Sequence, residues 1–190
     1  MAAGTRKLAV FNQVTLDGYF TDTHGDISWA HKHDAEWNAF VEGNAGTEGP
    51  LLFGRITYEM MAGFWPTPMA ATQMPKVAEG MNKRLKLVAS RTLDHVSWEN
   101  TRLLKGDLLD EVRRLKMEPG ADITILGSGS IVAQLAAAGL IDNYQVVINP
   151  IVLGEGRTMF EGIDKRPDLQ LTGSRTFANG SVLLSYEAVD

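Results

Sequence analysis

The stretch DITILGSGSIVAQLAAAG, residues 122–139, decides the fold class. DITILG is a short apolar run typical of a buried strand, and SGSIVAQLAAAG has the pattern of a helix that begins after glycine and ends at glycine. A buried strand that leads directly into a helix is the unit from which parallel sheets covered on both faces are built. We therefore expect an α/β protein with a mostly parallel, mixed sheet and helices on both faces.

The same alternation of strand and helix continues on both sides of this stretch, without an internal repeat or a linker. Residues 1–190 are therefore expected to form a single domain. Residues 65–83, rich in Pro, Met and Ala, are predicted to be an irregular excursion with one short helix. Asn179-Gly180, between two strand-like runs, predicts a C-terminal antiparallel hairpin. Strands are predicted over residues 7–14, 50–54, 85–90, 101–105, 122–127, 144–154, 169–177 and 181–189, and helices over 33–43, 55–64, 107–118 and 128–139.

Composition and charge limit the classes of partner. The chain has 18 basic and 23 acidic residues, a net charge of −5, without a long block of either sign. This balance argues against nucleic acid or an anionic membrane as the main partner, and it is compatible with a small-molecule substrate. No apolar run is long enough to predict a membrane span, and the first residues lack the apolar core of a signal peptide.

Cysteine is absent from the sequence. Disulfides, thiolate metal sites and a cysteine nucleophile are therefore excluded, and the absence is compatible with the cytoplasm, where we expect the protein. The sequence also contains no GxSxG nucleophile elbow, Walker A sequence or HExxH motif. Hydrolase and kinase functions thus have no positive signal.

The segment FGRITYE, residues 53–59, places Gly54 and Arg55 where a strand turns into a helix. Unpaired backbone N–H groups and the positive end of the helix dipole suit a phosphate there, and Arg55 adds a charge that can grip it with two bonds. Thr57 can cap the helix or contact a ligand. The alternative is that glycine and threonine merely begin the helix and that Arg55 is solvated.

The segment ILGSGS, residues 125–130, forms a second junction of this kind between a strand and a helix. Gly127 and Gly129 allow a ligand to approach the backbone closely, and Ser128 and Ser130 supply hydroxyl groups. The pattern is not a full GxGxxG, so a purely structural turn remains an alternative. Two phosphate-competent helix starts in one small domain are more informative than either alone.

Ser90 and Arg91 follow the strand predicted over residues 85–90. They would lie at the same sheet edge as Arg55 if the two strands are parallel neighbours, because ligands of such sheets gather beyond the carboxyl ends of the strands. A cluster of two arginines and a serine suits a 2′-phosphate and favours NADP over NAD. The alternative is an ordinary surface arginine at a strand end.

The loop TLDGYF, residues 15–20, interrupts the first strand. Gly18 permits a sharp turn, Asp17 offers a polar contact, and Tyr19 or Phe20 can cover a planar ring. A tight turn with Phe20 in the core is the alternative.

Asp34 stands just before a predicted helix, where a carboxylate is usually a cap. It becomes a candidate proton donor if it faces a pocket, and ordered water is an equal candidate. His31 and His33 are spaced like metal ligands, but no second compact cluster of ligands accompanies them, so no metal site is predicted.

Five motifs in order make the sequence recognisable. The set TLDGYF (15–20), GRITYE (54–59), SR (90–91), ILGSGS (125–130) and NPIVLGEGR (149–157) resembles the dihydrofolate-reductase-like superfamily. Within it, the chain looks most like the branch of the C-terminal reductase domain of bacterial riboflavin biosynthesis. The resemblance extends from Lys7 to about Tyr186, and the number, order and spacing of the motifs make it specific.

This resemblance implies a dihydrofolate-reductase-like fold, an eight-stranded or similar sheet and NADPH as the hydride donor. It also assigns the site residues. The loop after the first strand, with Val14 and Thr15, would close over the nicotinamide, and Trp29 and Asp34 are similar to a tryptophan and an acidic residue near the pterin of dihydrofolate reductase. Cofactor-binding residues would be Val14, Thr15, Gly54, Arg55, Thr57, Ser90, Arg91, Gly127, Ser128, Gly129 and Ser130; substrate-binding residues Tyr19 and Trp29; and catalytic residues Asp34 and Asp17.

The sequence departs from the family pattern at two points. The riboflavin reductase domain commonly has an acidic residue where this chain has Gly127, and the fused deaminase domain is absent. We therefore expect an NADPH-dependent oxidoreductase of a small planar heterocycle, pterin-like or ribosylaminopyrimidine-like. The alternatives are a non-catalytic NADP-binding or regulatory module and a structural dimeric domain. Members of this branch commonly form homodimers, to which the apolar segment INPIVLG would contribute.

Overall fold

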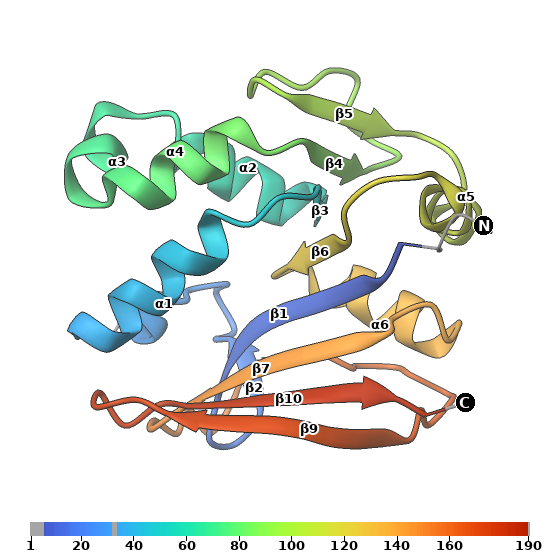
Figure 1. Cartoon of the computed structure of the whole chain (residues 1–190). Helices are drawn as coiled ribbons and strands as arrows, with labels where there is room; N and C mark the ends of the chain where they lie inside the picture. Colours follow the sequence, from blue (N-terminus) through green and yellow to red (C-terminus); the bar gives the residue numbers. More distant parts are fainter. Residues whose placement is uncertain (1–5, 32–33, 190) are drawn as a thin grey trace.

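The computed structural model describes residues 6–31 and 34–189 and contains one large and one small sheet (Figure 1). The large sheet has eight strands in the order β5-β4-β3-β6-β1-β7-β10-β9. Its strands are β1 (Leu8–Thr15), β3 (Leu51–Gly54), β4 (Lys86–Ala89), β5 (Thr101–Leu104), β6 (Ile123–Leu126), β7 (Asn143–Asn149), β9 (Leu169–Thr176) and β10 (Val182–Ala188), and the small sheet pairs β2 (Tyr19–Thr21) with β8 (Arg157–Thr158). The helices are α1 (Ala35–Ala45), α2 (Arg55–Phe64), α3 (Pro68–Gln73), α4 (Pro75–Lys83), α5 (Leu108–Met117) and α6 (Gly129–Ala137), with a 3-10 turn at Ser28–Ala30.

The pairing confirms a mostly parallel, mixed sheet. Strands β5, β4, β3, β6, β1 and β7 run parallel, whereas β10 pairs antiparallel with both β7 and β9. The terminal hairpin turns at Asn179-Gly180, as predicted, and Gly180 N–H donates to Phe177 O. Helices lie on both faces of the sheet. Successive residues of a strand point in opposite directions and therefore pack against helices on opposite faces. Leu52 belongs to the core cluster that includes residues of α5 and α6, and its neighbours Leu51 and Phe53 belong to the cluster with α2 and α4.

Two sequence expectations about the elements are corrected, and one small sheet was not predicted. Residues 65–83 form two helices, α3 and α4, because Pro68 and Pro75 each occupy a first helical turn, where proline's missing N–H costs nothing. Strand β7 ends at Asn149, just before Pro150, instead of continuing to residue 154. The sheet of β2 and β8 was not predicted. The predicted start of α1 at residue 33 lies outside the described residues, and α1 begins at Ala35.

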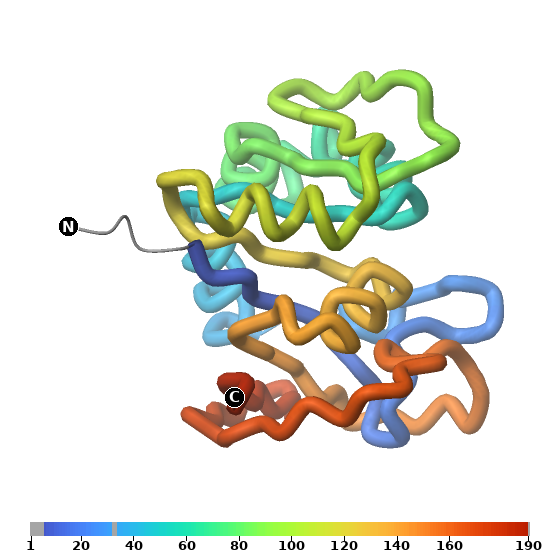
Figure 2. The backbone as a smooth tube through the Cα atoms, turned by 90° about the vertical axis from the view of Figure 1, so that its right-hand side faces the viewer, coloured from blue at the N-terminus to red at the C-terminus, as the bar shows by residue number. Residues whose placement is uncertain are grey.

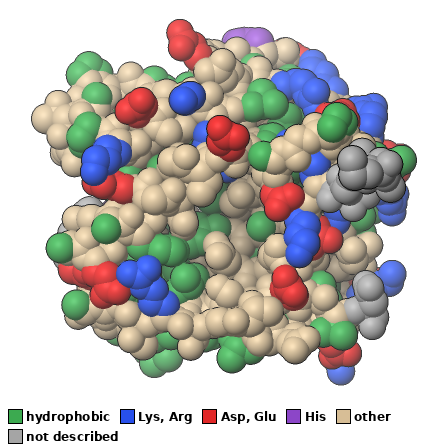
Figure 3. All heavy atoms as spheres, viewed as in Figure 1, with side chains coloured by type: hydrophobic (Ala, Val, Ile, Leu, Met, Phe, Trp, Pro, Cys, Tyr) green, Lys and Arg blue, Asp and Glu red, His purple; other side chains and the backbone are tan. Residues whose placement is uncertain are grey.

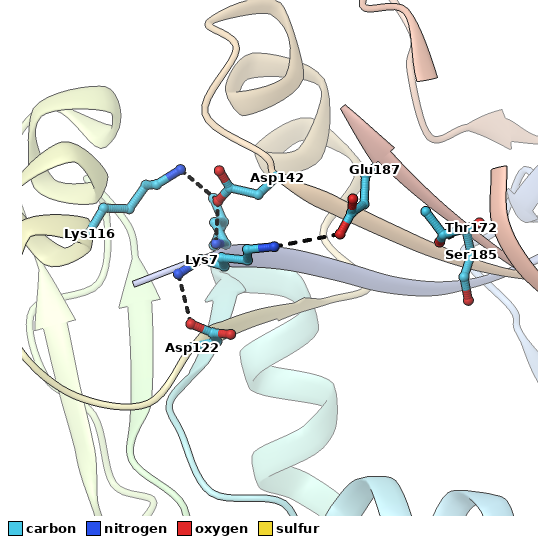
Figure 4. A network of polar contacts seen from close by, with 8 residues as sticks. Lys7, Lys116, Asp122, Asp142, Thr172, Ser185 and Glu187 are labelled. Atoms are coloured by element: carbon cyan, nitrogen blue, oxygen red, sulfur yellow. Dashed lines mark hydrogen bonds and ion pairs between the residues drawn. The ribbon is translucent and has the colours of Figure 1, made fainter. Parts of the chain in front are cut away.

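The amino end of β1 is fixed by a network of charged side chains (Figure 4). Lys7 N–H donates to Asp122 Oδ1 over 2.8 Å, and Leu8 N–H donates to Asp142 Oδ2 over 2.6 Å. The ammonium of Lys116 also contacts Asp142 Oδ2, at 2.6 Å. The amino end of the central strand is thus closed by polar bonds.

Lys86, the first residue of β4, is fully buried. Its Nζ donates to the carbonyl oxygens of Met81 and Asn82 in the last turn of α4, at 3.1 and 2.8 Å, and lies 4.4 Å from the centre of the Trp98 ring. Burial lowers the pKa of Lys86 to about 8, because the charged form has lost its water.

We expect stability to rise between pH 8 and 10 and Lys86→Met to abolish most of this rise. In that window the unfolded chain keeps the Lys86 proton, whereas the folded chain releases it, so raising the pH favours folding. The gain is on the order of 2 kcal/mol in the free energy of unfolding. Tyr144, whose pKa burial raises to about 12, acts in the opposite direction above pH 10. Urea unfolding of both proteins at several pH values measures the difference, and parallel curves would contradict the prediction.

Candidate functional site

A cavity of about 470 Å³ opens at the carboxyl ends of the central strands. Its wall combines segments that are far apart in sequence, and Figure 2 shows two of them, the loops that follow β1 and β7, on the same side of the molecule. Ligands of α/β sheets bind at this edge. The lining residues come from β1, the loop 20–30, the start of α2, the end of β4, residues 126–131 and Arg157.

The glycine turn between β6 and α6 joins the two helix starts that are predicted to bind phosphate. Gly127 and Ser128 both adopt left-handed backbone angles, with φ of +59° and +58°. Ser128 Oγ accepts a bond from Gly54 N–H over 2.9 Å, and Ser128 N–H donates to Thr57 Oγ1 over 3.0 Å. The starts of α2 and α6 are therefore tied together, and both face the same cavity. Thr57 and Ser128 are both buried and hold the two helix starts together, independently of any contact with a ligand.

The strands β3 and β4 are parallel neighbours, with Gly54 opposite Ala89. Arg55 and Ser90, which follow these residues, consequently line the same cavity, as the sequence suggested. Arg91 and Ser90 line an adjoining pocket of about 220 Å³. The guanidinium of Arg55 forms an exposed ion pair with Glu59 over 2.8 Å, so a phosphate at this point would compete with a carboxylate.

The helix α2 also supplies an apolar wall. Ile56 and Met60 are 65% and 43% exposed, although both are apolar, and they line the cavity together with Met61. Trp29 and Phe20 come from the loop after β1. Exposed apolar side chains gathered around a cavity are characteristic of a ligand site, and these suit a flat ring.

The loop after β1 is held by the Asp17 carboxylate. Thr15 Oγ1 donates to Asp17 Oδ1 over 2.5 Å, and the backbone N–H groups of Leu153 and Gly154 donate to Asp17 Oδ2 over 3.2 and 2.8 Å. These bonds, first that from Thr15, lower the pKa of Asp17, which keeps it ionised and ill suited to donate a proton. Asp17 thereby connects the loops that follow β1 and β7.

Most of the residues predicted as site residues in and next to this loop lie outside the cavity wall. Val14, Thr15, Asp17 and Tyr19 are not among the residues that line the cavity, whereas Phe20 is. The Phe20 ring packs directly on the first residue of α6, since a Cβ atom at Gly129 would lie 2.6 Å from it.

Asp34 caps α1 and lies outside the set of cavity-lining residues. Its Oδ1 accepts from Trp37 N–H over 2.9 Å and its Oδ2 from Asn179 N–H over 3.1 Å. Trp29 does line the cavity, so the spacing of five residues does not bring both side chains into it. The catalytic roles of Asp34 and Asp17 stay predictions, and the geometry gives each carboxylate a structural role.

The fold and the motifs can be compared with known proteins. A sequence model of the RibD C-terminal domain matches residues 6–183. The chain belongs to this family. Two relatives from Bacillus subtilis (strain 168) are the uncharacterized proteins YyaP, 27% identical over 182 residues, and YwjB, 25% identical over 181 residues. Each alignment covers 95% of this chain, and 94% and 97% of the respective relative.

Solved structures share the fold of this RibD C-terminal domain. A putative riboflavin biosynthesis protein from Shewanella sp. PV-4 has a TM-score of 0.74 at 22% identity, covering 97% of this chain and 99% of that one. Dihydrofolate reductase from Enterococcus faecalis, complexed with NADP(H) and RAB-propyl, has a TM-score of 0.67 at 18% identity, covering 97% of each chain. The resemblance to the dihydrofolate-reductase-like superfamily and the fold class are confirmed.

Arg157 is a cavity residue of this RibD C-terminal domain that the sequence did not single out. It ends the NPIVLGEGR motif, and that position was the available signal. Of the described residues that line the cavity, Arg55 and Arg157 carry a charge, and none is acidic. The described residues include no group of three His, Asp or Glu side chains that could hold a metal, and His33 lies outside them.

The surface charge and the lengths of the helices bear on the partners that the sequence predicts. Acidic and basic side chains are interspersed on the face seen in Figure 3, as the sequence suggested. No helix among the described residues is both long and apolar enough to cross a membrane.

Proposed function

We propose that this RibD C-terminal domain is an NADPH-dependent oxidoreductase of a small planar heterocycle, ribosylaminopyrimidine-like or pterin-like. One observation carries the proposal: two helix starts, tied by the bonds of Ser128 to Gly54 and Thr57, open into one cavity beside Arg55 and Ser90. Helix N-termini and arginines are the groups that hold a dinucleotide's phosphates. The fold shared with the NADP(H) complex of dihydrofolate reductase supports the same conclusion.

The residues present fit NADPH. Arg55, Ser90 and Arg91 stand at the ends of neighbouring strands, where they would hold the 2′-phosphate. The starts of α2 and α6 would hold the pyrophosphate through their backbone N–H groups. Thr57 and the Phe20 ring fill the spaces beside Gly127 and Gly129, so these glycines allow close packing within the protein. NADPH, when bound, supplies the hydride.

The remaining work of the protein is orientation and exclusion of water. Ile56, Met60 and Trp29 provide an apolar surface against which a flat ring can be placed. No carboxylate or histidine lines the cavity in the described part of the chain, so water is the proton source that fits this site.

The same lack of a general acid favours the second candidate function, a non-catalytic NADP-binding or regulatory module. Both functions require cofactor binding, and they differ in turnover. A diaminohydroxyphosphoribosylaminopyrimidine deaminase/5-amino-6-(5-phosphoribosylamino)uracil reductase from Thermotoga maritima shares the fold, with a TM-score of 0.68 at 13% identity, and this chain covers 57% of it. A ribosylaminopyrimidine is therefore among the substrates to test.

Fluorescence titration tests the cofactor. We expect NADPH to bind more tightly than NADH, and Arg55→Ala to weaken NADPH roughly tenfold, because a charge-assisted phosphate contact is lost. The lost ion pair with Glu59 is exposed and should not affect folding. Arg102→Ala is the matched control, since Arg102 is an exposed arginine of β5 outside the cavity.

Absence of binding to either cofactor would contradict both candidate functions. Turnover then separates them: consumption of NADPH with a panel of pterins, ribosylaminopyrimidines and quinones supports the oxidoreductase. Cofactor binding without any turnover supports the module.

A further inference from the structure

Arg157 is a charged side chain at the cavity wall without an ion-pair partner among the described residues. Its guanidinium makes no hydrogen bond or ion pair with any residue in the ranges 6–31 and 34–189. The other charged lining residue, Arg55, is already paired with Glu59. A cation without a counter-ion at the edge of an apolar cavity attracts anionic ligands.

The backbone on both sides of Arg157 is fixed, although the side chain is exposed. Arg157 pairs with Thr21 in the small sheet, and Gly156 packs so closely that a Cβ atom there would lie 2.3 Å from the carbonyl oxygen of Thr21. Two residues further on, Met159 is buried, and its sulfur lies 2.9 Å from Asn12 Nδ2. Arg157 is therefore held at a defined place instead of at the tip of a loose loop.

The two arginines reach the cavity from different sides. Arg55 follows β3, whereas Arg157 lies beyond β7, and β6 and β1 separate these strands in the sheet. The residues proposed for the cofactor phosphates gather around β3, β4 and β6. Arg157 consequently remains available for a second anion, on the side of the loop that carries Phe20.

We propose that Arg157 selects the substrate by binding its anionic group, a phosphate or a carboxylate. This inference rests on the proposed function, since it assumes that a heterocycle occupies the cavity beside the cofactor. No acidic lining residue among those described opposes such a charge, and none is present to pair with a cationic ring. A guanidinium binds either group through two parallel bonds, which fixes orientation as well as charge.

Paired probes test the proposal. Uridine 5′-monophosphate and uridine differ by a phosphate, and orotate and uracil differ by a carboxylate. We expect calorimetric titration to show roughly tenfold tighter binding of at least one anionic probe than of its neutral partner. Arg157→Gln should abolish that preference, Arg157→Lys should retain part of it, and Arg102→Gln, the matched exposed arginine, should leave it unchanged.

The titrations are made with and without saturating NADP⁺, so a failure to bind the cofactor is a separate result. A preference for the phosphate probe alone, or for the carboxylate probe alone, identifies the group and supports the proposal. Equal binding of anionic and neutral probes by the wild-type protein overturns it, as does a preference that survives in Arg157→Gln. Failure of both anionic probes to bind at millimolar concentration also overturns it. A loss of NADPH affinity in Arg157→Gln with unchanged probe binding would assign Arg157 to the cofactor.

Discussion

Gly127→Ala is expected to weaken NADPH binding more than tenfold and to lower the free energy of unfolding by about 2–3 kcal/mol. Gly127 has a left-handed φ of +59°, which costs an alanine about 1 kcal/mol. The added Cβ would also lie 2.9 Å from Thr57 Cγ2. Because Thr57 is buried and accepts the bond from Ser128 N–H, the clash would separate the starts of α2 and α6.

Gly139→Ala provides the matched control for this prediction. Gly139 has a similar φ of +65°, but nothing lies within 4 Å of the position that its Cβ would take. It should therefore show the backbone cost alone, about 1 kcal/mol, with unchanged NADPH affinity. Urea unfolding and fluorescence titration of the two variants separate the backbone cost from the effect of the clash with Thr57. Equal NADPH affinities for both variants would show that the tie between the helices does not shape the cofactor site.

The fold could be predicted because its signals are local and repeated. The strand and helix over residues 122–139 and the hairpin around Asn179-Gly180 each combine periodicity with a glycine that ends or turns the element. The strand ends then follow from topology, since parallel neighbours place Arg55 and Ser90 at one edge. The sequence thus predicted that Arg55 and Ser90 lie at one edge of the sheet, whereas the bonds of Ser128 to Gly54 and Thr57 were not predicted.

The part of the cavity wall formed by β8 could not be predicted in the same way. Strand β8 has two residues, too few for any period, and its position depends on the close contact of Gly156 with Thr21. Asp34 shows a different limit, because a carboxylate before a helix suits both a cap and a catalyst. In the structure, Asp34 accepts a bond from Asn179 N–H, 145 residues away, and the local sequence gives no sign of this contact.

Asp17→Ala is expected to impair closure of the loop after β1 over the cofactor and to reduce turnover roughly tenfold, with little change in the unfolding midpoint. The carboxylate is exposed, and the buried hydroxyl of Thr15, which loses it as an acceptor, still accepts a bond from Tyr19 N–H over 3.0 Å. It nevertheless accepts the bonds from Thr15, Leu153 and Gly154 that connect the loops following β1 and β7. Those loops carry Phe20 and Arg157 into the cavity wall. Because the pKa of Asp17 is lowered, the connection is present at neutral pH and is lost only as the pH falls through that lowered pKa.

Asp122→Ala is the control for this effect, because Asp122 is an exposed carboxylate that accepts a backbone bond at the opposite end of β1 (Figure 4). It should leave NADPH affinity unchanged, whereas Asp17→Ala should reduce it at neutral pH. Lowering the pH should abolish the difference between wild type and Asp17→Ala, since protonation breaks the same connection in the wild-type protein. Asp17→Ala could instead lower the unfolding midpoint and leave NADPH affinity intact. The loop would then be a simple turn, because loss of a carboxylate that shapes the cavity would reduce NADPH affinity.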